Sequence, residues 1–108
     1  MSLKIIPTPE FSRSVKKLHK HYRLIAKDLK ELEEELQENT HAGIELGNHC
    51  FKIRLPNSSV PTGKSGGFRV IYYLQTTEAI YLLAIYSKND LENIDQKHLV
   101  EILVANGL

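Results

Sequence analysis

FKIRL, residues 51–55, and FRVIYYL, residues 68–74, are the two segments that decide the fold of this chain. Successive side chains of a strand point to opposite faces, so each segment sends one apolar set of side chains into a core. Lys52 and Arg54 then point together to the other face, and Arg69 is the one charge of the second segment. Cations on one sheet face, with no acidic residue in the same strands, predict an anion-binding surface. Phosphodiester is the commonest large anion.

Length and composition indicate one domain, which we expect to span residues 1–108. The chain is 42% hydrophobic, enough for a core that needs neither a disulfide nor a metal. Its single cysteine suits a reducing, cytoplasmic location. No apolar run approaches the roughly 20 residues of a membrane helix, and no secretory signal is recognisable. We therefore expect no membrane association. The net charge of +1 does not by itself favour a nucleic-acid-binding protein.

The N-terminal third predicts a short strand followed by two helices. The strand, residues 3–6, should stop at Pro7, after which Thr8 offers a capping oxygen and Pro9 suits the first helical turn. Two apolar stripes at helical spacing follow, with a break at residues 21–23. They consist of Phe11, Val15, Leu18 and Tyr22, and of Ile25, Leu29, Leu32 and Leu36. The helices should form a hairpin that ends before Asn39, followed by a polar loop with Gly43 and Gly47.

The C-terminal half predicts three strands and a helix. Strands are expected at residues 50–55, 67–75 and 79–86, with a long exposed loop at 57–67 and a tight turn at 76–78. The third strand is apolar on both faces, which indicates a second cover, a helix over residues 95–105. The predicted fold is α+β: an N-terminal strand, a two-helix hairpin, an antiparallel three-strand meander and a C-terminal helix.

Motifs outside the strands carry little chemistry. Gly63-Lys64-Ser65 does not make a phosphate-binding P-loop, because Ser58 stands where the first glycine belongs and a strand follows. Lys64 remains a candidate phosphate contact. The scattered histidines lack the spacing of a zinc module, so we predict no metal. Tyr73 falls on the face of Arg69 and could stack on a base.

Three segments, FKIRL (51–55), GGFRVIYY (66–73) and IYSKND (85–90), together resemble the bacterial RelE/ParE toxins of type II toxin–antitoxin systems. The long loop before residues 66–67 is similar to that of the HigB-type branch of RelE. The resemblance implies a RelE-like microbial ribonuclease-type fold and an mRNA endoribonuclease (an mRNA interferase) that acts on the ribosome, needs no cofactor and inhibits translation. It also implies a cognate antitoxin as partner, within a toxin–antitoxin hetero-oligomer.

The resemblance also implies roles for individual residues. Lys52 and Arg54 fall where the family has paired strand lysines, Arg69 falls on its phosphate-stabilising arginine, and Lys88 on its proposed general acid. Arginine stays protonated at physiological pH, so Arg54 is a poor base and Lys52 the better candidate. Ile94 stands near the position of a catalytic tyrosine.

Tyr73 or Tyr86 would then have to supply the stacking ring. Two alternatives stay open: a ParE-like inhibitor of DNA gyrase, and a weakly active member that serves mainly as an antitoxin-binding co-repressor.

Overall fold

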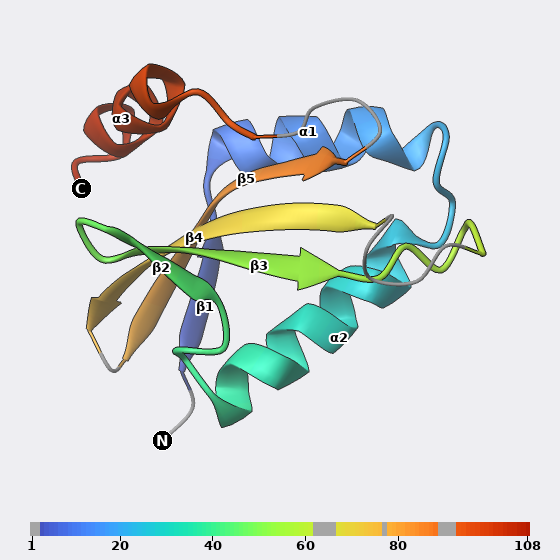
Figure 1. Ribbon diagram of the computed structural model, residues 1–108, viewed down its shortest axis with the longest axis horizontal. Helices are drawn as coiled ribbons and strands as arrows, with labels where there is room; N and C mark the ends of the chain where they lie inside the picture. Colours follow the sequence, from blue (N-terminus) through green and yellow to red (C-terminus); the bar gives the residue numbers. More distant parts are fainter. Residues whose placement is uncertain (1–2, 62–66, 77, 89–92) are drawn as a thin grey trace.

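The computed structural model describes residues 3–61, 67–76, 78–88 and 93–108 (Figure 1). The elements run in the order β1 (Lys4–Pro7), α1 (Pro9–His19), α2 (Ile25–Glu38), β2 (Ile44–Gly47), β3 (Cys50–Leu55), β4 (Phe68–Thr76), β5 (Ala79–Ser87) and α3 (Gln96–Ala105). The predicted α+β class is confirmed, and the predicted helices and strands form within one or two residues of their expected ends.

The sheet is larger than predicted. It has five strands in the order β1-β5-β4-β3-β2, with β3, β4 and β5 forming the expected antiparallel meander. β1 joins it parallel to β5, which the sequence did not indicate because pairing between distant segments leaves no local signal. The prediction of a loop around Gly43 and Gly47 is wrong for residues 44–47, because they form strand β2, which pairs antiparallel with β3.

A two-residue turn explains the extra strand β2. Gly47 pairs with Cys50, and Asn48 and His49 between them both have positive φ, 52° and 64°. Two successive left-handed residues are the mark of a type I′ hairpin turn, whose twist matches that of the strands it connects. Asparagine tolerates this conformation well, but histidine at the second position gave no clear turn signal.

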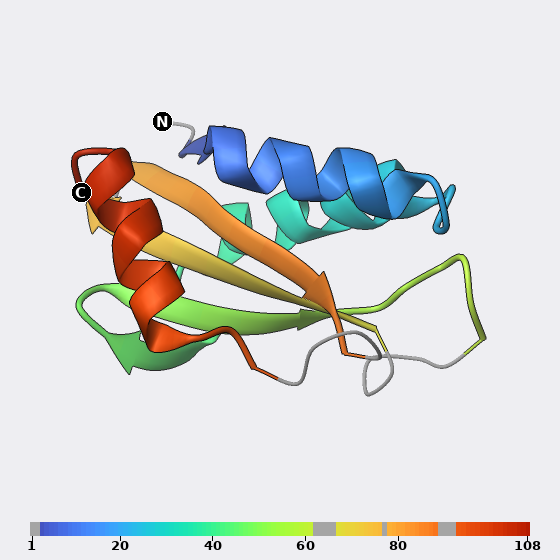
Figure 2. The same ribbon diagram turned by 90° about the horizontal axis from the view of Figure 1, so that it is seen from above.

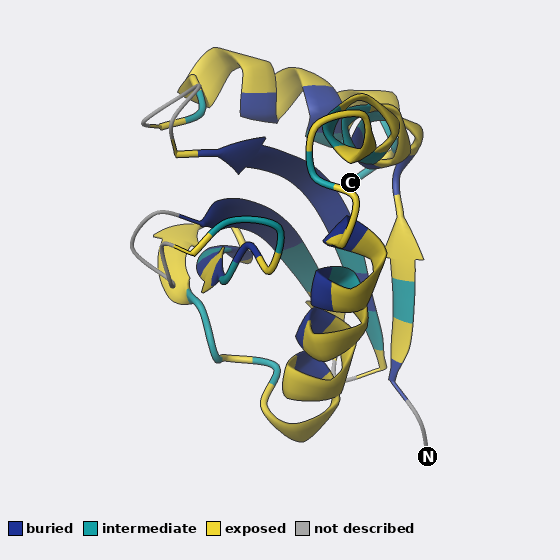
Figure 3. Cartoon of the chain, turned by 90° about the vertical axis from the view of Figure 1, so that its right-hand side faces the viewer, coloured by how far each residue is buried: buried dark blue, intermediate teal, exposed yellow. Residues whose placement is uncertain are grey.

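The two faces of the sheet carry two separate apolar clusters. α1 and α2 lie together on one side (Figure 2), and their stripes pack against side chains such as Phe51, Phe68 and Tyr72. α3 packs on the other face, where Leu99 and Ile102 meet Ile71 and others. Buried segments lie mostly in the strands and on the helix surfaces turned toward them (Figure 3). Among the described residues, no helix combines the length and apolarity that a membrane span needs.

A β-bulge in β5 changes which side chains share a face. Ile71 pairs with Ala84, but Tyr72 pairs with Leu82, so Leu83 is an extra residue on β5. Leu83 and Ala84 consequently both belong to the α3-side cluster, and every residue after them is on the face opposite to the one simple alternation predicts.

The segment after β3 is partly anchored rather than exposed. Asn57 is buried, and the buried carboxylate of Asp28 on α2 accepts hydrogen bonds from the backbone N–H and the hydroxyl of Ser58. Ser59 Oγ accepts a bond of 3.0 Å from the Leu24 N–H. The prediction of an exposed loop is therefore wrong at Asn57, which is buried, and at Ser59, which is half-buried, but holds at Ser58.

Candidate functional site

Three side chains form a row across the centre of the sheet on its α3 face. Arg54 of β3 lies directly opposite Arg69 of β4, and Arg69 lies directly opposite Tyr86 of β5. Directly paired residues of antiparallel strands have Cβ atoms about 4.5–5.5 Å apart. The bulge at Leu83 is what turns Tyr86 onto this face, because uninterrupted alternation would have sent it toward α1 and α2. We call Arg54, Arg69 and Tyr86 the central row.

Arg69 is the most enclosed cation of the site. Its side chain is 6% exposed, and its Nη1 donates a hydrogen bond of 3.3 Å to the carbonyl oxygen of Phe68. The guanidinium is thus held close to its own strand. Arg54 opposite it is exposed. The cross-strand pair thus places two arginines opposite each other on one face of the sheet.

Lys52 lies on the same face, two residues before Arg54 along β3, and is half-buried. Its Nζ donates a hydrogen bond of 3.1 Å to Oδ1 of Asn93. Asn93 precedes α3, so the chain that leaves β5 reaches back over the sheet as far as β3. Asn93 was not among the residues predicted for the site, because it lies about forty residues from Lys52 along the chain and no motif marks it.

Lys88 follows the last residue of β5 and is exposed. Its backbone N–H donates to the Gly67 carbonyl at 3.2 Å, which extends the β4–β5 pairing by one residue. Because the bulge precedes it, alternation places Lys88 on the face of Tyr86. In the described part of the chain, no carboxylate forms an ion pair with Lys52, Arg54 or Lys88. The ion pair seen among the described residues is within α3, between His98 and Glu101.

Gly67 is required where β3 and β4 come closest. A Cβ atom on Gly67 would lie 2.2 Å from the carbonyl oxygen of Leu55, a contact that no backbone shift of ordinary size relieves. The residue before Phe68 must therefore be glycine if Arg69 is to stay opposite Arg54. From the sequence, Gly67 was expected at the junction of the loop 57–67 and the strand 67–75, without this close contact.

Tyr86 is 8% exposed, and its hydroxyl has no hydrogen-bond partner among the described residues. Burial raises the pKa of Tyr86, and this effect outweighs a hydrogen-bond contribution from the Ile94 backbone, too weak in geometry to count as a full hydrogen bond, and the charge of Arg69. The phenol therefore stays protonated at neutral pH and can donate a hydrogen bond. Ile94 packs in the same apolar cluster as Tyr86.

The other predicted contacts lie apart from the row or outside the described residues. Tyr73 is on the α3 face as predicted, but it pairs with Cys50 and Tyr81, and its ring contacts those of His49 and Tyr81. It lies four positions after Arg69 in β4, which is about 13 Å along the strand. Lys64 lies outside the described residues. Within those residues, histidine, cysteine, aspartate and glutamate nowhere gather in a group suited to a metal ion.

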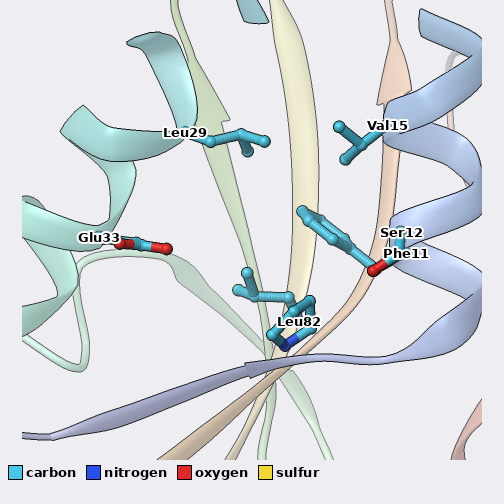
Figure 4. Close-up of a pocket in the computed structure, with 7 residues that line it drawn as sticks. Phe11, Ser12, Val15, Leu29, Glu33 and Leu82 are labelled. Atoms are coloured by element: carbon cyan, nitrogen blue, oxygen red, sulfur yellow. The ribbon is translucent and has the colours of Figure 1, made fainter. Parts of the chain in front are cut away.

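An apolar pocket of about 220 Å³ lies on the opposite side of the sheet, between α1 and α2. Phe11 and Val15 of α1 line one side and Leu29 of α2 the other, with Leu82 of β5 between them (Figure 4). Glu33 contributes a carboxylate at its edge. This pocket carries no cation, so its chemistry suits an apolar side chain rather than a phosphate.

Comparison with known proteins agrees with this architecture. Residues 4–106 match the family model described as "RelE toxin of RelE / RelB toxin-antitoxin system". A mutant of the E. coli toxin RelE in the free state is similar with a TM-score of 0.59 and 17% identity, over 100% of both chains. The same mutant in complex with an antitoxin RelBc peptide gives a TM-score of 0.54 and 14% identity, over 100% of this chain and 96% of that one.

No functionally curated protein sequence matches the chain. The two structural similarities concern the fold alone, but the family model covers nearly the whole sequence. This chain therefore belongs to the RelE toxin family.

Proposed function

We propose that this protein is the toxin of a toxin–antitoxin pair and that it cleaves mRNA in the decoding site of the ribosome. Membership of the RelE toxin family supports the general class. The observation that carries the finer proposal is the direct pairing of Arg54 with Arg69 on one sheet face, beside Tyr86. Guanidinium groups on two neighbouring strands can together contact the oxygens of one phosphodiester, because arginine makes paired hydrogen bonds to such oxygens.

The proposed reaction is an internal transesterification. The ribose 2′-oxygen attacks the adjacent phosphorus as its proton passes to a base, and the bond from phosphorus to the 5′-oxygen breaks. The leaving oxygen takes a proton from an acid, so the products are a 2′,3′-cyclic phosphate and a free 5′-hydroxyl. Negative charge builds up on the phosphoryl oxygens during the attack, and fixed cations lower the energy of that state.

The residues have separate roles in this reaction. Arg69 holds the phosphoryl oxygens from an enclosed position, and Arg54 adds charge from the neighbouring strand. Lys52 is the candidate base, held over the sheet by its bond to Asn93. Lys88 at the end of β5 is the candidate acid. The ring of Tyr86 is the candidate surface for a base next to the scissile phosphate. Tyr73, farther along β4, is a candidate RNA contact, and Lys64 remains a candidate contact from the sequence.

The test is mRNA cleavage after induced expression, mapped with translation running and with translation blocked. Cleavage should depend on translation and should fall at least about a hundredfold in Arg69→Ala, because loss of one preorganised donor to a charged transition state has effects of this size. Arg23→Ala is the matched control, since Arg23 is an exposed arginine in the turn between α1 and α2.

Three results would contradict the nuclease proposal. Equal toxicity of the wild type and Arg69→Ala would remove the catalytic assignment of the row. Intact mRNA together with cleaved DNA–gyrase complexes would point to the gyrase alternative. Harmless expression at every level would favour the co-repressor role.

We also propose a cognate antitoxin as partner, because the solved E. coli RelE is bound by an antitoxin peptide. The exposed side of α1 is basic, which favours an acidic segment, and the pocket between α1 and α2 offers a place for an apolar side chain. Co-expression with the product of the neighbouring reading frame should yield a stable complex and abolish toxicity. Failure of the two proteins to co-purify would contradict this assignment.

A further inference from the structure

A second groove runs along α1 beside the sheet and ends at the central row. It consists of two hollows of about 240 and 300 Å³ that share Ser14 and Lys17. The first extends toward α3, where Arg13 and His98 line it. The second extends the other way, to His21 and to Tyr86 of the row. We call the two hollows together the α1 groove.

The strand arrangement explains why the groove exists. β1 pairs with β5 only as far as Leu82, so in the described part of the chain no strand lies beside the outer edge of β5 from Leu83 to Ser87. α1 runs along this edge instead (Figure 1). A helix leaves more space beside a strand edge than a paired strand does, because its side chains hold the two backbones apart.

The groove has a positively charged side. Arg13, Lys17 and His21 follow one another at intervals of four residues, which places them on one side of α1 and its C-terminal turn. All three are exposed yet line the groove. The first two keep their positive charges at neutral pH.

A carboxylate closes the far end of the groove. Glu10 Oε1 accepts a hydrogen bond of 3.1 Å from Asn106 Nδ2, which ties α1 to the end of α3. This bond holds the pKa of Glu10 below its ordinary value of 4.5, with Arg13 adding a smaller effect. The far end is therefore negative at neutral pH, so an anionic ligand would have to enter between Arg13 and the row.

Tyr86 connects the groove to the row. It lies opposite Arg69 in the sheet and also lines the second hollow, together with the apolar side chains of Leu18 and Ile85. The Ile94 backbone is close enough to the buried hydroxyl to lower its pKa, but the hydroxyl donates no hydrogen bond within the described part of the chain, so its proton is available to a polar ligand group.

We propose that the α1 groove binds the stretch of the RNA strand next to the scissile phosphate, with a nucleobase against Tyr86, Leu18 and Ile85 and the following phosphates at Lys17 and Arg13. Aromatic floors with flanking cations are how proteins hold single strands without reading sequence. This inference rests on the proposed function, since the row must hold the scissile phosphate for the groove to hold its neighbours.

The test is RNA binding by the isolated toxin, measured by fluorescence anisotropy with a 2′-O-methyl RNA that cannot be cleaved. One probe is a mixed-sequence strand long enough to reach from Arg69 to Arg13; the other is a dinucleotide that covers only the row. The test variant is Arg13→Glu/Lys17→Glu. The matched control is Lys27→Glu/Lys30→Glu, which changes the net charge equally on the exposed side of α2.

The groove variant should bind the long probe roughly ten- to thirtyfold more weakly near 0.1 M salt, and its log affinity should fall with log salt by about 1.4 less than that of the wild type. Its affinity for the dinucleotide and the affinity of the control for both probes should change by less than about twofold. Arg13→Lys/Lys17→Arg, which keeps both charges, should retain wild-type binding and shows whether charge is the cause.

Other outcomes overturn the inference in distinguishable ways. If the groove variant and the control lost affinity for the long probe equally, the loss would reflect the change in net charge and not a specific contact in the groove. Unchanged RNA affinity in the groove variant, with cleavage still lost in Arg69→Ala, would refute the groove and leave the proposed function standing. If, in addition, antitoxin binding weakened, the groove would belong to the protein partner. If the wild type did not bind the long probe, the proposal that the α1 groove binds RNA would also be refuted. If the wild type in addition failed to cleave mRNA, the proposed function would be refuted too.

Discussion

Phe68 and Arg69 are neighbours in β4, but they point to opposite faces of the sheet and meet different surroundings. Both are buried, with exposed fractions of 0% and 6%. Phe68 lies among apolar side chains beneath α1 and α2, and its ring meets that of Tyr22 edge-on at 5.4 Å. Arg69 lies between Arg54 and Tyr86.

Burial therefore has different consequences on the two faces of this sheet. On the α1–α2 face, burial removes apolar surface from water and stabilises the fold. At the central row, burial encloses the side chain of Arg69 opposite a second arginine, Arg54, so this part of the sheet carries positive charge rather than apolar surface. We interpret the first face as the structural core and the row as a binding site that the core holds in place.

The largest expected effect on stability comes from the core side. Phe68→Ala should lower the free energy of unfolding by about 3–5 kcal/mol, because it removes a buried ring and leaves a cavity. Urea denaturation measures this loss. Val104→Ala, at a residue that is 71% exposed on α3, is the control and should change little. A loss below about 1 kcal/mol for Phe68→Ala would mean that this core repacks, contrary to our interpretation.

Gly67 tests how closely β3 and β4 must approach at the row. Gly67→Ala should cost about 3 kcal/mol, since its Cβ would overlap the Leu55 carbonyl oxygen. Gly107→Ala is the matched control: it has a φ of 71° but open space around it, so only backbone strain of about 1 kcal/mol applies. Thermal unfolding of both variants gives the comparison. Equal losses of stability in the two variants would show that the contact between residue 67 and the Leu55 carbonyl does not restrict this position to glycine.

A buried charge on the core side should behave differently from Arg69. Asp28 is 0% exposed, but Ser58 satisfies its carboxylate with two hydrogen bonds. Asp28→Ala should cost about 1–3 kcal/mol by leaving the Ser58 N–H unpaired, while RNA cleavage per folded molecule should persist. Denaturation and cleavage assays on the same preparation separate the two effects. Lost cleavage in a folded Asp28→Ala protein would extend the site beyond the row.

Two tyrosines sharpen the same contrast. The hydroxyl of Tyr72 donates to the Thr40 carbonyl at 2.8 Å and accepts from the Gly43 N–H at 3.1 Å, so Tyr72→Phe should cost about 1–2 kcal/mol. Tyr86→Phe should leave stability nearly unchanged, because its hydroxyl has no partner among the described residues, but it should weaken RNA binding. Calorimetry measures the stability of the two variants, and fluorescence anisotropy measures their RNA binding. A destabilised Tyr86→Phe would assign that hydroxyl to the fold.

The smallest effect concerns the tie between α1 and α3. The Asn106 hydrogen bond lowers the pKa of Glu10, so this bond stabilises the folded state above the carboxyl's ordinary pKa and the contribution disappears as pH falls through the lowered value. Asn106→Ala should move the pKa of Glu10 back up toward 4.5, which NMR titration detects. An unchanged pKa in this variant would contradict the assigned cause.

Local patterns predicted most of the fold. Thr8 and Pro9 start α1 as expected, with the Thr8 hydroxyl accepting from the Phe11 N–H at 3.2 Å. Apolar periodicity located α1, α2 and the three strands of the meander, because it reports directly which side of an element is buried. The parallel pairing of β1 and the hairpin of β2 escaped prediction, since each depends on partners that the local sequence does not specify.

The placement of the candidate residues on the faces of the sheet was predicted in part. Alternation along β3 correctly placed Lys52 and Arg54 together, and along β4 it placed Arg69 with Tyr73. It failed along β5, where the extra residue Leu83 reverses the faces of all later side chains. An extra residue in a uniformly apolar strand leaves no polar marker, so the sequence offered no means to find it.

Patterns along the chain were enough to predict the class of the domain, the positions of its helices and central strands, and the cationic side chains of its central sheet. Which of these side chains meet depends on the fold: strand pairing sets Arg54 against Arg69, and the bulge brings Tyr86 beside them. The physical reason is that periodicity reports burial along one segment, whereas register between segments depends on hydrogen bonds and packing that form only when distant parts of the chain come together.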